Sequence, residues 1–260
     1  MPIGLFKMNN NINSGLLTRN KVEVTADEKK LQQNNYLEAV KAFARLTYES
    51  VYIIDYTNMS FEYVSENPLF LCGHTPAEVL QMGYNFYFKN VPPEDLELLT
   101  RINEAGFDFY EKQAGKNKKL YSITYDFHLI NRDGKRVLIN HKLTPLFLTN
   151  EQKMWKAMCV VSISNHQNAG NVYIHKQGAN EIWQLDTTNN TWHKLQKPRL
   201  NKRETEVLRL HAQGLTINQI AERLFVVPDT VKYYRRQIFE RLEVSNMTEA
   251  LSVAVNRQII

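Results

Sequence analysis

The sequence predicts an α+β protein with an antiparallel sheet and flanking helices, followed by a β-hairpin and an all-α four-helix domain. Three observations support this. Residues 121–130 alternate between apolar and polar side chains, as a half-buried strand does. Helix-start signals at Thr75 and Pro92 interrupt a series of short apolar runs. The last sixty residues contain four helical patterns with capping residues before them.

Length and composition fit two soluble domains. The chain has 260 residues, of which 43% are hydrophobic and 23% charged, and its net charge is +5. This net positive charge permits nucleic-acid binding but does not require it. No apolar run approaches the roughly 18 residues of a membrane span, and residues 1–20 lack the pattern of a secretory signal. Cys72 and Cys159 stand far apart in apolar strings, so we expect two buried, reduced thiols and a cytoplasmic location.

The first part of the chain contains a helix and two strands. Residues 1–25 are rich in asparagine and without periodicity, which predicts a flexible lead-in. A helical pattern begins near Ala26 and continues through Leu37, Val40 and Ala44. Residues 51–55 and 61–64 are short apolar runs around a polar turn, which is typical of paired strands.

Short helices and three more strands follow. Thr75-Pro-Ala-Glu78 has the form of a capping box with proline in the first helical position, and Pro92-Pro-Glu-Asp95 predicts a second helix start. Asp133-Gly134 forms a hairpin turn between residues 121–130 and 137–139. Residues 155–164 complete the series as a last strand.

This order of elements resembles a PAS domain over about residues 47–165. The resemblance rests on residues 51–55, 61–65, 73–78 and 92–95, and on the turn Asn131-Arg-Asp-Gly134. A PAS resemblance implies a sensor or dimerisation module and does not name the signal. The aromatic residues between Tyr48 and Tyr87 are then mostly core, with a pocket for a small apolar ligand as the alternative.

No cofactor, metal ion or catalytic group is expected. Phe86 stands where the flavin-binding photosensor subclass of PAS domains has its reactive cysteine. His74, His128 and His141 are not paired at metal-ligand spacing, and Cys72 with His74 supplies two potential zinc ligands instead of four. Sequence signatures of phosphate loops, hydrolase elbows, zinc proteases, kinases and receiver domains are absent, so the chain is not expected to be an enzyme.

Residues 166–197 are interpreted as a hairpin connector between two domains. The runs 181–185 and 191–194 flank a polar turn, and Trp183 and Trp192 are expected to pack across the two strands. Lys197-Pro-Arg199 indicates the boundary that follows. The predicted division is therefore 1–25, 26–165, 166–197 and 198–260.

The final segment reads as four short helices. The first follows Asn201 and ends at Gly214; Thr216 caps the second, with Gln219 in its third position. The third begins at Pro228, and the fourth follows Asn246. The expected inward positions are Val207, Leu208, Leu210, His211, Ile220, Ala221, Leu224, Val231, Ile238 and Leu242. Two short helices around a tight turn, the second one basic, are typical of a helix-turn-helix.

Here the residues closely resemble the LuxR/GerE-type DNA-binding domain over about residues 198–260. The similar segments are 200–208, 214–216, 220–224 and 230–232, and Glu204, Leu208 and Gly214 fall at that family's spacings as structural residues. One departure is Val227-Pro228, where the family has a Ser or Thr cap, so we expect a helix with a weaker cap.

The resemblance assigns the DNA contacts. It implies base contacts by Lys232, Tyr233 and Arg236, and the helical period agrees, because these residues lie opposite the inward stripe. Four other residues are expected to contact phosphate groups: Thr216, Asn218, Tyr234 and Arg235. A basic helix face that is merely solvated is the alternative.

The resulting hypothesis is a one-component transcription regulator that binds double-stranded DNA as a homodimer. The two copies are expected to contact each other through the helix that starts near Ala26 and through Ala250, Leu251 and Ala254 of the last helix. Contact with RNA polymerase and a small-molecule ligand in the PAS domain are further expectations, and no membrane is involved. The alternative hypothesis is a protein-interaction module that binds DNA only together with a partner protein.

Overall fold

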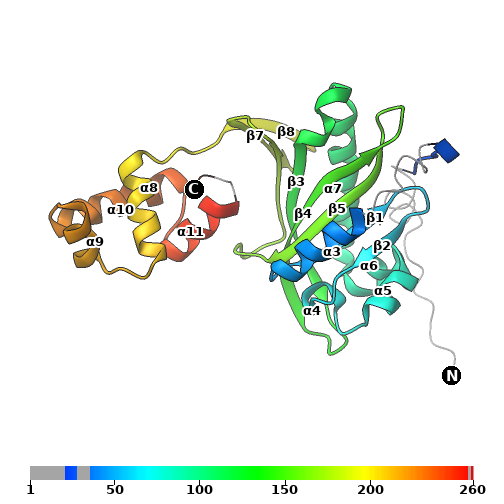
Figure 1. Ribbon diagram of the computed structural model, residues 1–260, viewed down its shortest axis with the longest axis horizontal. Coiled ribbons are helices and arrows are strands. Elements are labelled where there is room, and N and C mark those ends of the chain that lie inside the picture. The colour runs from blue at the N-terminus through cyan, green and yellow to red at the C-terminus, as the bar shows by residue number, and fades with distance from the viewer. Residues whose placement is uncertain (1–20, 28–35, 257–258, 260) are drawn as a thin grey trace. The chain divides into compact units, whose positions relative to one another are not determined.

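The computed structural model describes residues 21–27, 36–256 and 259 (Figure 1). The chain divides into two compact units, residues 1–195 and residues 196–260, called here the N-terminal and C-terminal units. Most of the predicted lead-in and the first turns of the helix expected from Ala26 lie outside the described residues. No helix among the described residues is both long enough and apolar enough to cross a membrane.

The N-terminal unit is built on an antiparallel sheet. Its strands are β1 Ser50–Asp55, β2 Ser60–Val64, β3 Tyr121–Ile130, β4 Arg136–Leu148, β5 Met154–Ile163, β6 Gly170–Lys176, β7 Glu181–Asp186 and β8 Thr191–Gln196. Their order is β2-β1-β5-β4-β3-β6-β7-β8, and the pairs from β2 to β7 are antiparallel. The predicted turn at Asp133-Gly134 joins β3 to β4, with Gly134 at φ 76°.

Helices begin after Thr75 and Pro92, as the sequence predicted, and the structure adds short helices for which no start was predicted. The helices of this unit are α3 Tyr36–Leu46, α4 Pro68–Leu71, α5 Pro76–Met82, α6 Asn85–Asn90 and α7 Pro93–Glu111, followed by the 3₁₀ helix η1 Gly115–Leu120. The capping box at Thr75 is confirmed, because its side chain accepts from the Glu78 N–H and Glu78 accepts from the Thr75 N–H. A helix, two strands, short helices and three strands follow one another in the predicted order, and the PAS-like fold is thereby confirmed.

Strand β1 is buried on both faces. Tyr52 and Ile54 point into the main core, which the helices between β2 and β3 share with the sheet. Val51 and Ile53 point to the opposite face and pack with Val40 of α3. Because successive side chains of a strand alternate between faces, two covered faces require the unbroken apolar run that the sequence has here.

Strands β6 to β8 extend the sheet beyond the PAS-like elements. The sequence analysis predicted a hairpin at β7 and β8 but missed β6, which pairs with β3 and so joins the hairpin to the sheet. Trp183 and Trp192 both pack on Phe109 of α7, at ring-centroid distances of 5.2 and 5.3 Å, and the Trp192 indole donates to the Ala105 carbonyl at 3.2 Å. The two indoles thus anchor the hairpin to a helix.

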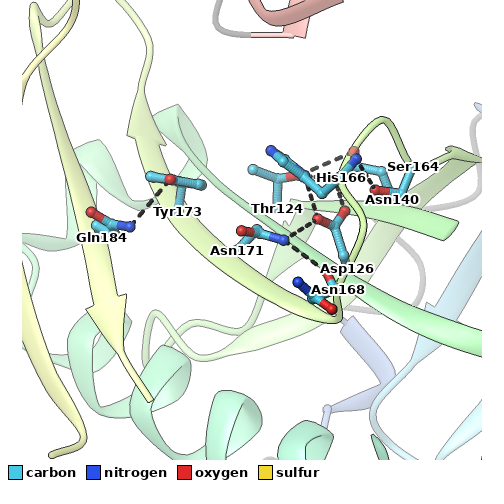
Figure 2. A network of polar contacts seen from close by, with 9 residues as sticks. All are labelled: Thr124, Asp126, Asn140, Ser164, His166, Asn168, Asn171, Tyr173 and Gln184. Carbon is cyan, nitrogen blue, oxygen red and sulfur yellow. Dashed lines mark hydrogen bonds and ion pairs between the residues drawn. The ribbon is translucent and has the colours of Figure 1, made fainter. Parts of the chain in front are cut away.

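A buried carboxylate holds the loop between β5 and β6 (Figure 2). Asp126 of β3 has no exposed surface and accepts hydrogen bonds from the side-chain amides of Asn140 at 2.7 Å and Asn171 at 2.9 Å. His166 Nδ1 lies 2.5 Å from Asp126 Oδ2, and Ser164 Oγ accepts from the His166 N–H. A charged group this deeply buried needs such partners, and three of them come from β4, the loop and the start of β6.

The C-terminal unit contains α8 Lys202–Ala212, α9 Ile217–Leu224, α10 Pro228–Leu242 and α11 Met247–Asn256. Most of the predicted inward residues of the first three helices are buried, which confirms the helical pattern, whereas Leu210 and His211 of α8 are only half-buried. The Thr216–Gln219 capping box is present, and Gly214 ends α8 at φ 84°, a conformation that favours glycine. Val227 provides no side-chain cap for α10, as the departure from the family pattern predicted.

Candidate nucleic-acid interface

Helix α10 has one buried and one exposed face. Val231, Ile238 and Leu242 are almost entirely buried among the helices of the C-terminal unit. Lys232 and Arg236, one turn apart on the opposite side, are exposed, and Tyr233 beside them is 55% exposed. The structure therefore brings the three predicted base-reading residues together on one accessible surface.

The charges on this face are available for a ligand. Lys232 Nζ lies 2.9 Å from Asp229 Oδ1, and this contact holds the pKa of the Asp229 carboxyl below its usual value. Both side chains are exposed, so the pair is weak and Lys232 can exchange it for another acceptor. Within the described part of the chain, Arg236 has no ion-pair partner. Two cations are thus presented to solvent from successive turns.

Two of the predicted phosphate-binding residues lie at the start of α9. The hydroxyl of Thr216 belongs to the capping box with Gln219, and both Thr216 and Asn218 are exposed. The helix start also presents backbone N–H groups, which favour an anionic oxygen. This position suits a contact that fixes orientation without reading bases.

The other two predicted phosphate-binding residues lie on the flank of α10. Tyr234 is half-buried against the helical core, 5.8 Å from the Tyr233 ring. Arg235 is half-buried as well: its guanidinium carbon lies 5.9 Å from the Phe239 ring centroid, and its Nε is buried without a hydrogen-bond partner in the described structure. The structure does not place Arg235 on the same face as Arg236.

The three residues predicted to be structural lie away from this face. Glu204 is 1% exposed and accepts from the backbone and side chain of Asn201, at 2.9 and 2.8 Å. Leu208 is fully buried, and Gly214 provides the left-handed residue after α8.

One exposed residue near the interface was missed. Phe225, which ends α9, has φ 56° and is 95% exposed. The apolar run Leu224-Phe-Val-Val227 reads as core by composition, and no pattern in the sequence distinguishes Phe225 from its neighbours. Its exposure follows from the left-handed turn, which points this side chain away from the helical core.

The predicted dimer contact on α11 needs correction in two residues. Ala250 and Ala254 have no exposed surface, because they pack into the core of the C-terminal unit itself. Leu251 is half-buried, and Val255 is the exposed apolar residue of this helix. An interface through α11 would therefore use Val255 and the edge of Leu251.

The histidines singled out in the N-terminal unit have protein partners. His74 is buried between Asn90 and Arg132, and His128 contacts Asp95. His141 is fully buried with Nε2 2.6 Å from the Tyr52 hydroxyl, and burial lowers its pKa to about 3. Among the described residues no group of three or more His, Cys, Asp or Glu could hold a metal ion. Cys72 and Cys159 are free and buried, as predicted, and burial raises the pKa of both thiols.

Two helices around a tight turn, the first with a capping box and the second with an exposed basic face, define a helix-turn-helix DNA-binding domain. Residues 198–254 match the family described as bacterial regulatory proteins, luxR family. The C-terminal unit is therefore a LuxR-type helix-turn-helix domain.

Curated relatives share this segment. Over 63 residues the chain is 38% identical to the probable transcriptional regulatory protein NarL of Mycobacterium tuberculosis. This segment makes up 24% of this chain and 29% of NarL. It is 39% identical over 61 residues to the transcriptional regulatory protein LiaR of Bacillus subtilis, again 29% of that protein. To the oxygen regulatory protein NreC of Staphylococcus haemolyticus it is 24% identical over 136 residues, 52% of this chain and 58% of the relative. The chain thus spans less than a third of NarL and LiaR and little more than half of NreC.

Solved structures resemble larger parts of the chain weakly. A ligand and DNA complex of Vibrio cholerae VqmA is 14% identical, covers 86% of this chain and 89% of its own, and gives a TM-score of 0.34. A PAS domain from Colwellia psychrerythraea is 13% identical, covers 50% of this chain and 98% of its own, and gives a TM-score of 0.38.

Proposed function

We propose that this chain is a transcription regulator, without enzymatic activity, that binds specific double-stranded DNA through α10. The single observation that carries the proposal is the exposure of Lys232, Tyr233 and Arg236 on one face of a helix whose other face is fully packed. Lysine and arginine can each donate to guanine O6 and N7 in the major groove, and a tyrosine ring can pack on a thymine methyl. Thr216, Asn218, Tyr234 and Arg235 would contribute phosphate contacts that set orientation.

The binding species is proposed to be a homodimer. One short recognition helix reaches few base pairs, and two copies reading half-sites about one helical turn apart supply the remaining specificity. Helix α3 of the N-terminal unit supports dimer formation. Its side chains Phe43 and Leu46 are 43% and 84% exposed, whereas Val40 on the same helix is buried. Apolar side chains exposed along one helix are typical of a surface that another chain covers.

The PAS-like part is proposed to sense a signal or to hold the dimer together. Its aromatic core and the exposed apolar side chains of α3 support these two roles.

The test is a selection of genomic fragments bound by the purified chain, at two salt concentrations, with Arg236→Ala in parallel. Arg209→Ala, an exposed arginine of α8, is the matched control for loss of one positive charge. The proposal expects an enriched site with two-fold symmetry that Arg236→Ala loses and Arg209→Ala keeps. Diffuse, salt-sensitive binding by all three proteins would contradict it and favour the protein-interaction module that needs a partner to read sequence.

A further inference from the structure

The turn between α9 and α10 exposes two apolar side chains, Phe225 and Val227, called here the turn pair. They are 95% and 64% exposed, whereas Val226 between them packs against the core of the C-terminal unit. Backbone hydrogen bonds hold the turn on both sides. The Val226 N–H donates to the Ala221 carbonyl at 2.9 Å, and the Thr230 N–H donates to the Val227 carbonyl at 3.0 Å. A fixed backbone therefore presents the turn pair to solvent.

Both members of the turn pair are unfavourable by local rules. Phe225 has φ 56°, a left-handed conformation that is rare for a bulky side chain and that glycine adopts readily. Val227 occupies the N-cap position of α10 and supplies no side-chain hydrogen bond there, and valine is among the poorest N-cap residues. Neither side chain is needed to fill the core, because both are exposed. Two neighbouring breaks of local preference without a gain in packing indicate a functional position.

The turn pair lies directly before the first turn of the proposed recognition helix. Pro228 is the first residue of α10, and Asp229 in the same turn is exposed. In a helix-turn-helix, the N-terminal residues of the second helix are those that contact base edges in the major groove. The turn pair is therefore at the end of α10 that approaches the bases.

Electrostatic attraction does not account for a contact at this turn. Glu222 and Asp229 are acidic, Arg223 and Lys232 are basic, and all four are exposed, so the charges that flank the turn pair cancel. Lys232 is moreover paired with Asp229 at 2.9 Å. An apolar contact remains, and the major groove offers one apolar group for it, the C5 methyl of thymine.

We propose that the turn pair contacts a thymine methyl group in each half-site and makes the chain prefer thymine at that position. The inference rests on the proposed function and adds an apolar contact to the polar base contacts of Lys232 and Arg236. Because the turn is already fixed in the free protein, little conformational freedom is lost when the contact forms. Burial of one methyl group corresponds to about a fourfold gain in affinity.

The experiment measures how removal of the methyl group changes affinity. The full chain is titrated, by fluorescence anisotropy, with a duplex that carries the site recovered in the genomic selection. Each thymine is then replaced by uracil, one position at a time in both half-sites. Uracil keeps the pairing and the O4 acceptor of thymine and lacks only the methyl group. The expected result for wild type is a loss of about fourfold for each contacted methyl that is removed.

Two variants of the turn pair are titrated with the same duplexes. Phe225→Gly and Val227→Ser remove the apolar side chains and improve the local conformation, so the free protein should be at least as stable as wild type. Both should bind the thymine duplex about fourfold more weakly per half-site and lose little more when the contacted methyl is removed. Glu243→Gly, which makes the same backbone change after the far end of α10, is the matched control and should respond to uracil as wild type does.

Tyr233→Ala is titrated in parallel, because the Tyr233 ring is itself proposed to pack on a thymine methyl. The position at which this variant alone becomes insensitive to uracil is assigned to Tyr233. A methyl effect that couples only to Tyr233 would overturn the inference about the turn pair, and so would a half-site without thymine or equal losses on uracil in wild type and both turn-pair variants. In these cases a DNA site has been selected, and the proposed function stands. A chain that selects no site at all contradicts the proposed function and this inference together, and a partner protein then becomes the occupant of the turn.

Discussion

Arg241 Nε, near the end of α10, lies 3.1 Å from Oε1 of Glu204, near the start of α8. The same carboxylate caps α8 through Asn201, so one buried acid joins the start of one helix to the end of another. Helix α10 carries the proposed recognition face, and Glu204 therefore helps to fix the orientation of that face relative to α8.

Glu204→Ala is expected to destabilise the C-terminal unit by about 2–4 kcal/mol. The change removes a helix cap and several hydrogen bonds to a buried carboxylate. Chemical denaturation, followed through the unfolding transition of the C-terminal unit, measures this loss of unfolding free energy. Glu206→Ala, which breaks an exposed pair with Arg203, is the control and should change stability by less than about 1 kcal/mol. Similar losses in both variants would contradict the assigned role.

Phe225→Gly is expected to stabilise the C-terminal unit by about 1 kcal/mol. Phe225 holds a left-handed conformation that strains an L side chain, and it is 95% exposed, so the ring contributes little packing. Glu243, which follows α10, has the same left-handed conformation at φ 57°, so Glu243→Gly is expected to stabilise the unit in the same way. A lower unfolding temperature of Phe225→Gly would show that the ring packs in solution.

Acid is expected to destabilise the N-terminal unit through His141. Burial lowers the pKa of its imidazole to about 3, below the usual value near 6.5, so the unfolded chain binds one more proton between these values. Stability is then lost as pH falls below 6.5, by about 2 kcal/mol at pH 5.

His141→Gln tests this assignment, since an amide can still accept from Tyr52 but does not titrate. The difference in unfolding free energy between pH 7 and pH 5 should shrink by about 2 kcal/mol in the variant. The lowered pKa of His74 acts in the same direction but is present in both proteins, so the comparison isolates His141. An unchanged pH dependence would place the titrating group elsewhere.

Asp126→Ala is expected to loosen the loop between β5 and β6. Removing the carboxylate leaves the amides of Asn140 and Asn171 without their buried acceptor, at a cost of about 3 kcal/mol. Hydrogen exchange should accelerate most over residues 164–171. Asp133→Ala, in the exposed turn between β3 and β4, serves as the control. Uniform acceleration over the whole sheet would point to global destabilisation instead.

Arg236→Ala and Arg235→Ala are expected to affect DNA binding differently. Loss of Arg236 should cost about 1–3 kcal/mol on the selected site and relax its specificity. Loss of Arg235, on the flank of α10, should weaken binding to all sequences alike and reduce the dependence on salt. Binding to the selected and a scrambled duplex at two salt concentrations separates these effects, and equal losses on both duplexes for both variants would contradict the assignment.

Local signals in the sequence were sufficient for most elements. Thr75 and Thr216 with their partners three residues on, Pro93 and Pro228 at helix starts and Gly134 in its hairpin act over a few residues, and all are found where predicted. The inward stripe of α10 follows from helical period alone, so the exposed positions of Lys232, Tyr233 and Arg236 could be predicted without a structure.

What the sequence could not determine depends on contacts between distant residues. Strand β6 has only two buried aliphatic side chains, Val172 and Ile174, and is fixed by pairing with β3 and by the contact of Asn171 with Asp126. Trp183 and Trp192 pack on Phe109, far away in the chain, Ala254 is buried by neighbouring helices, and Arg235 is half-buried with its Nε enclosed. Such features arise from which surfaces meet, and only the tertiary structure decides that, because local propensity carries no information about distant partners.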